Sequence, residues 1–135
     1  MKNNQSKNKE MNRDRFSISK RLLSFRYATK GILYALRTQH NLWIHLTAAL
    51  LVVGFGIFFS LSTCEWIGVS FGIGMVISAE IFNSSIEKLT DLASPGLSRK
   101  AGQVKDMAAG AVFICAITAA IIGLFIFAPK IFAFL

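Results

Sequence analysis

Three carboxylates and one amide occur at helical spacing within an otherwise apolar stretch of the sequence. Glu80, Asn83, Glu87 and Asp91 are separated by three, four and four residues. On a helix that turns about 100° per residue, this spacing places all four side chains on one narrow stripe. If this apolar stretch spans a membrane, placing carboxylates in it costs free energy, and such residues usually have a binding partner or a chemical role. The stripe therefore marks the first candidate for a functional site.

A lysine and a further acid, Lys105 and Asp106, follow at the start of the next apolar segment. Phosphoryl transfer needs oxygens that hold Mg²⁺, a cation beside the moving phosphate and a base for the attacking hydroxyl. An alternative is a non-catalytic oligomeric membrane protein, or an ion or proton pathway lined by Glu80 and Glu87. A third interpretation is that the acids pair with Lys88, Lys105 or a neighbouring protomer only to hold helices together.

The chain that carries these groups is short and hydrophobic. It has 135 residues, of which 53% are hydrophobic and 16% charged, and its formal net charge is +8. A soluble domain of this size would need a largely apolar surface, so the composition predicts a membrane protein. The basic surplus favours an anionic membrane surface or a phosphate-bearing ligand over nucleic acid. Cys64 and Cys115 stand alone and indicate neither a disulfide nor a zinc site.

Hydrophobic patterning predicts an all-α membrane protein. A disordered basic tail is expected over residues 1–14 and a single membrane domain over residues 15–135, beginning with an amphipathic surface helix at about 16–38. Apolar segments at about 42–61, 66–89 and 107–127 are each long enough to cross the bilayer. Basic residues gather before the first span and between the second and third, which predicts a cytoplasmic N-terminus.

Two blocks of the sequence resemble the signature of the prokaryotic diacylglycerol kinase family: residues 80–91 (EIFNSSIEKLTD) and residues 104–112 (VKDMAAGAV). The resemblance covers about residues 20–129. It implies a homotrimer in the bacterial inner membrane that transfers the γ-phosphate of ATP, with Mg²⁺, to the hydroxyl of a membrane lipid. The lipid is diacylglycerol or undecaprenol. The resemblance also implies that each active site faces the cytoplasm and is shared between protomers.

The same resemblance assigns roles to individual residues. Glu80 corresponds to the general base and, with Asn83 and Ala109, to the lipid-substrate site. Glu87 corresponds to a carboxylate that binds Mg²⁺ together with Gln39. The residues expected to bind ATP are Tyr27, Gln39, Asn83, Glu87, Asp91, Gly96, Leu97, Ser98, Lys105 and Asp106.

One position departs from the family's pattern. The family usually has a Glu two positions before the equivalent of Asn41, and here that position is Gln39. An amide oxygen still coordinates Mg²⁺, but it brings one less negative charge, so weaker metal affinity is expected, and an inactive homologue is the alternative. Asn41, His45 and Glu65-Trp66 are more similar to the branch that prefers undecaprenol, although Trp66 also suits a membrane-interface anchor.

Overall fold

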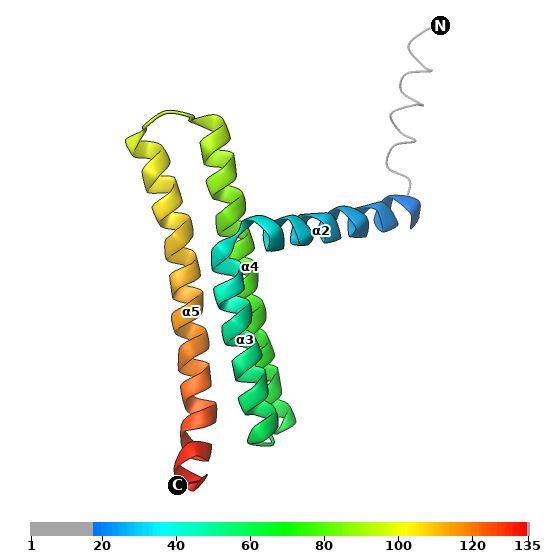
Figure 1. Cartoon of the computed structure of the whole chain (residues 1–135), viewed down its shortest axis with the longest axis vertical. Coiled ribbons are helices and arrows are strands. Elements are labelled where there is room, and N and C mark those ends of the chain that lie inside the picture. Colours follow the sequence, from blue (N-terminus) through cyan, green and yellow to red (C-terminus); the bar gives the residue numbers. More distant parts are fainter. Residues whose placement is uncertain (1–17, 135) are drawn as a thin grey trace, which may run out of the picture. The chain divides into compact units, whose positions relative to one another are not determined.

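The computed structural model describes residues 18–134, and the tail predicted over residues 1–14 lies outside them. Four helices make up this part of the chain: α2 (Ile18–Thr38), α3 (His40–Phe58), α4 (Thr63–Ala93) and α5 (Arg99–Phe134) (Figure 1). None of the described residues forms a strand. The all-α prediction is confirmed, and α2 coincides with the predicted surface helix within two residues of its start.

Three of these helices, α3, α4 and α5, are long and apolar enough to cross a membrane. They contain 19, 31 and 36 residues, so α4 and α5 extend well beyond the predicted apolar segments. The third segment was expected to end before Pro129, yet α5 continues through it to Phe134. A proline inside a membrane-spanning helix is tolerated because neighbouring groups satisfy the freed carbonyl.

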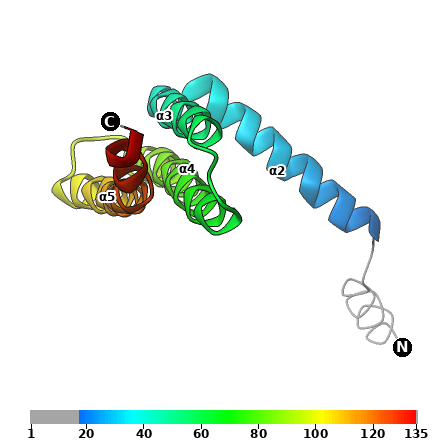
Figure 2. The ribbon, with the colours of Figure 1, turned by 90° about the horizontal axis from the view of Figure 1, so that it is seen from below.

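The chain divides into two compact units, Met1–Tyr34 and Ala35–Leu135. The second unit contains α3, α4 and α5, and α4 packs against both of the other helices (Figure 2). The single domain expected over residues 15–135 stays a prediction.

One face of α4 carries its buried residues. Val69, Gly72, Val76, Glu80 and Asn83 follow one another at intervals of three or four residues, and all are buried. At Gly72, a Cβ atom would lie 3.3 Å from the Cβ of Ala119 on α5, so a small residue here permits close approach of the two helices. The polar residues Glu80 and Asn83 thus continue the packing face instead of facing lipid.

At the end of the second unit opposite the α4–α5 loop, polar and aromatic contacts join the three helices. Ser62 and Glu65 form a capping box at the start of α4. Glu65 also forms an ion pair with Lys130 of α5, with 3.1 Å between Lys130 Nζ and Glu65 Oε1. A Cβ atom at Gly56 would lie 2.8 Å from the Trp66 ring, so α3 and α4 also approach closely here. The Phe59 ring meets Phe127 and Phe134 edge-on.

Candidate functional site

The four polar residues of α4 change steadily from buried to exposed along the helix. Glu80 is 3% exposed and Asn83 is 6% exposed. Glu87, one turn further, is partly covered, and Asp91 is exposed. The stripe therefore leads from the interior of the helix bundle to the loop between α4 and α5.

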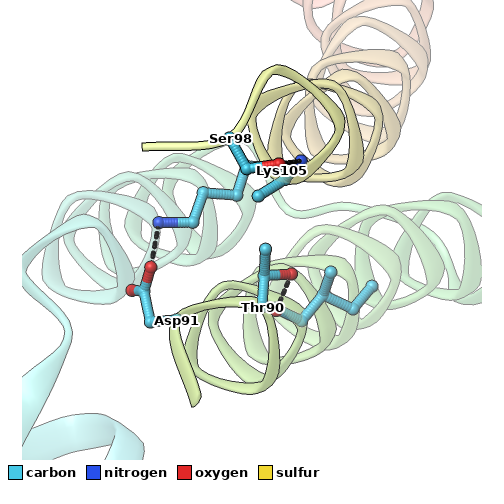
Figure 3. A network of polar contacts seen from close by, with 6 residues as sticks. Thr90, Asp91, Ser98 and Lys105 are labelled. Atoms are coloured by element: carbon cyan, nitrogen blue, oxygen red, sulfur yellow. Dashed lines mark hydrogen bonds and ion pairs between the residues drawn. The ribbon is translucent and has the colours of Figure 1, made fainter. Parts of the chain in front are cut away.

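Lys105 on α5 faces the exposed end of this stripe. Its ammonium forms an ion pair with the Asp91 carboxylate, joining α5 to α4 (Figure 3). Lys105 lies one turn before Ala108, which is buried together with Val112, so it belongs to the face of α5 that packs on the bundle. This pair is the arrangement expected if some of the acids hold helices together.

The buried end of the stripe has a different neighbour, His45 of α3. Its Nε2 atom lies 4.0 Å from Glu80 Oε2, and both side chains are largely covered. In the sequence, His45 is linked only to the branch that prefers undecaprenol, and no role in the site is predicted for it. The available signal was that His45 is the only ionisable residue in the first apolar segment.

Asn83 presents a buried oxygen without a partner. Among the described residues, its Oδ1 atom is buried and accepts no hydrogen bond. Leaving a buried acceptor unsatisfied costs about 1–3 kcal/mol, which is tolerated where a ligand supplies the missing partner. Asn83 lies one helical turn after Glu80 and one turn before Glu87. A ligand bound to its oxygen would therefore lie between these two carboxylates along α4.

Gln39 lies at the break between α2 and α3. It has extended backbone angles and is partly covered. Its N–H donates to the Ala35 carbonyl at 2.8 Å, and the Trp43 indole donates to the Leu36 carbonyl at 2.8 Å. These two hydrogen bonds satisfy the Ala35 and Leu36 carbonyls at the end of α2 and hold the backbone at Gln39 in place.

The remaining predicted residues are on the surface of their elements. The Ser98 hydroxyl accepts a long hydrogen bond from the Ala101 N–H at 3.4 Å and so caps the start of α5 (Figure 3). Tyr27 is exposed on α2 and belongs to the first compact unit, whereas the other predicted site residues belong to the second. The other exposed residues are Gly96 and Leu97 in the loop and Asp106 and Ala109 on α5.

The donor atoms here suit a cation that arrives with a nucleotide. Within residues 18–134, no three His, Cys, Asp or Glu side chains gather closely enough to hold a metal ion. Mg²⁺ usually takes one or two carboxylates, keeps several waters and draws its other ligands from substrate phosphates. Glu87 is such a carboxylate, and the free Asn83 oxygen is a hard donor one turn away, so the residues fit Mg²⁺ that is bound jointly with phosphate.

Comparison with known proteins decides the family. The profile described as "Prokaryotic diacylglycerol kinase" matches residues 26–127, which is more than half of the chain. The chain belongs to the prokaryotic diacylglycerol kinase family. This member is 40% identical over 108 residues to the undecaprenol kinase of Bacillus subtilis (strain 168), covering 80% of this chain and 88% of that protein. It is 33% identical over 103 residues to the diacylglycerol kinase of Synechocystis sp., covering 76% of this chain and 59% of that protein.

Membership of the diacylglycerol kinase family confirms two predictions. The resemblance of residues 80–91 and 104–112 to the family's signature is correct, and the chain is an enzyme of the lipid kinase class. The three apolar helices make it a multi-pass membrane protein. A non-catalytic ion or proton pathway is disfavoured, because the curated relatives named above are kinases.

Proposed function

We propose that this kinase transfers the γ-phosphate of ATP to a lipid hydroxyl at the cytoplasmic face of the bacterial inner membrane, with Glu80 as the general base. The observation that carries the proposal is the graded stripe on α4. A buried carboxylate at one end suits a lipid hydroxyl, and an exposed carboxylate beside Lys105 at the other end suits a nucleotide from water. The basic residues before the first span and those on either side of the α4–α5 loop, namely Lys88, Arg99, Lys100 and Lys105, support the cytoplasmic orientation.

In the proposed reaction the Glu80 carboxylate takes the proton of the lipid hydroxyl. The lipid oxygen then bonds to the γ-phosphorus as the bond from that phosphorus to the bridging oxygen breaks, and ADP leaves with the electron pair. Lys105 stabilises the negative charge on the phosphate oxygens. Asn83, with its free acceptor oxygen, orients the groups that meet between Glu80 and Glu87.

Glu87 and Gln39 are the proposed Mg²⁺ ligands, bound jointly with the phosphates of ATP. Mg²⁺ would supply neutralisation of the phosphate charge. The proposal also includes a homotrimer whose active sites are shared between protomers. In it, Tyr27 and the loop residues Gly96, Leu97 and Ser98 help to enclose ATP.

The substrate that we propose is undecaprenol, with diacylglycerol as the second candidate. The relative named undecaprenol kinase shares more identity with this chain than the relative named diacylglycerol kinase, and the match covers more of its length. A polyprenol has one hydroxyl on a long apolar chain, which suits a base that lies deep on an apolar helix.

The test of the function is label transfer from γ-labelled ATP to lipid by the purified protein in detergent or vesicles. Undecaprenol and diacylglycerol are offered side by side, and the extracted lipid is counted. Labelled undecaprenyl phosphate in excess over phosphatidic acid is the expected result. Label in neither lipid contradicts the proposed kinase activity, and label mainly in phosphatidic acid reverses the choice of substrate.

Restoring the family's carboxylate at position 39 tests the metal site. Gln39→Glu is expected to lower the Mg²⁺ concentration for half-maximal activity by about threefold to tenfold, because a second carboxylate adds charge to the ligand set. The measurement is a Mg²⁺ titration of lipid phosphorylation at fixed ATP. Gln103→Glu, at an exposed position of α5, adds the same charge elsewhere. If both variants show the same Mg²⁺ dependence as the native protein, Gln39 is not a metal ligand.

A further inference from the structure

The Glu80 carboxylate is buried inside the helix bundle. Glu80 is 3% exposed, with apolar Val76 buried one turn earlier on the same face of α4 and polar Asn83 and Ser84 buried one turn later. A carboxylate in apolar surroundings needs a partner that holds it in one rotamer, because rotamers without polar contacts are all costly. A general base also acts efficiently only when its oxygen points at the proton that it takes.

His45 is the group that meets this carboxylate from another helix. The distance of 4.0 Å between His45 Nε2 and Glu80 Oε2 is longer than a hydrogen bond. Catalytic hydrogen bonds are often long before substrate binds and tighten in the complex. The two atoms would have to approach by about 1 Å to form a hydrogen bond.

A half-open apolar pocket lies beside His45. Its volume is about 270 Å³, and residues of α3, α4 and α5 line it, Ala48, Val76 and Ala119 among them. His45 is the only titratable side chain of the lining. Of the residues that line this pocket, only His45 carries a group that can pair with the Glu80 carboxylate.

The backbone that carries His45 is well anchored. Leu42, three residues earlier and on the same face of α3, is 2% exposed. The Trp43 indole is bonded to the Leu36 carbonyl across the break at Gln39. A side chain on a helix fixed in this way can hold a neighbour at a defined position.

We propose that His45 is a positioning residue, whose imidazole holds the Glu80 carboxylate in the orientation from which it takes the lipid hydroxyl proton. The inference rests on the proposed role of Glu80 as the base. His45 acts through Glu80 and exchanges no atom with the substrate.

The test compares three replacements of His45 in the full-length protein. His45→Ala removes the imidazole, His45→Gln keeps an N–H donor at about the reach of Nε2, and His45→Asn keeps a polar side chain that is too short. We expect kcat for lipid phosphorylation to fall about 10- to 100-fold in the Ala and Asn variants, with KM for ATP almost unchanged, because misplacing a catalytic group lowers the rate after binding. His45→Gln should restore most of the lost kcat.

Thr47→Ala is the matched control on the same helix. Thr47 is exposed, and its hydroxyl donates only to the Trp43 carbonyl of its own helix among the hydrogen bonds described, so kcat should stay at the native value. Thermal unfolding in detergent checks the fold of every variant. If the alanine variant does not fold, the comparison of Asn with Gln carries the test, since a merely structural role gives no advantage to the longer amide.

Two results overturn the inference. One is a native kcat in both His45→Ala and His45→Asn, and the other is a loss that Gln repairs no better than Asn. Glu80→Gln, measured in parallel, separates this failure from that of the proposed function. When Glu80→Gln abolishes label transfer and the His45 variants do not lower it, only the positioning role fails. When Glu80→Gln keeps the native rate, both proposals fail.

Discussion

Replacing Glu80 by glutamine is expected to lower the rate of lipid phosphorylation by about 10²- to 10⁴-fold, the usual contribution of a general base. The amide has the size and shape of the carboxylate but does not accept a proton at neutral pH. Because Glu80 is almost completely buried, a neutral side chain is cheaper to place there than a charged one, and the fold should be kept. The measurement is label transfer from γ-labelled ATP at saturating lipid and ATP.

The matched control for this variant is Glu65→Gln. It makes the same chemical change at the opposite end of α4, where the carboxylate belongs to a capping box and pairs with Lys130. It should lower thermal stability slightly, because the capping box and the ion pair are both weakened, and leave kcat at the native value. A Glu80→Gln protein that phosphorylates lipid as fast as the Glu65→Gln protein contradicts the assignment of the base.

Replacing Lys105 by methionine is expected to lower kcat/KM for ATP by about 10²-fold, since a cation aimed at the charge that develops in the transition state is worth this much. Methionine keeps an unbranched apolar stem of similar length while removing the charge. The loss should appear in both kcat and KM, because the proposed phosphate contact would be made both before and during transfer. Steady-state kinetics over a range of MgATP concentrations measure both.

Lys130→Met is the corresponding control, because Lys130 also pairs with a carboxylate and also lies on α5, but at the other end of the helix. It should leave kcat/KM unchanged. Asp91→Asn distinguishes a structural ion pair from a contact with phosphate. Either replacement breaks the Lys105–Asp91 pair, so a purely structural role makes Lys105→Met and Asp91→Asn equally harmful, and a phosphate contact makes the lysine replacement far more harmful.

Periodicity along one helix could be predicted from the sequence, and contacts between helices could not. The spacing of Glu80, Asn83 and Glu87 was enough to place them on one stripe, because side-chain direction in a helix depends only on residue number. The pairing of Glu80 with His45 depends on how α3 is rotated against α4, which is decided by the packing of residues such as Leu42 and Gly56. No local pattern in the first apolar segment carries that information.

The ends of the helices show the same division. The third span was expected to end at about residue 127, before Pro129, but α5 continues to Phe134, and the Lys130 charge pairs with Glu65 of a different helix. The extended backbone at Gln39 likewise follows from two hydrogen bonds to the end of α2, one of them from a tryptophan side chain four residues later. Family resemblance supplied the expected roles of the site residues, and their three-dimensional placement required the structure.

The length of α4 ties the proposed chemistry to the thickness of the bilayer. At a rise of 1.5 Å per residue, the 31 residues of α4 span roughly 46 Å, against a hydrocarbon layer of about 30 Å. Glu80 and Asp91 are then about 16 Å apart in depth, so the acceptor hydroxyl can stay among the acyl chains while the nucleotide stays in water. A membrane that is too thick or too thin would move one end of the stripe into the wrong solvent, so we expect lipid composition to alter turnover through hydrophobic mismatch.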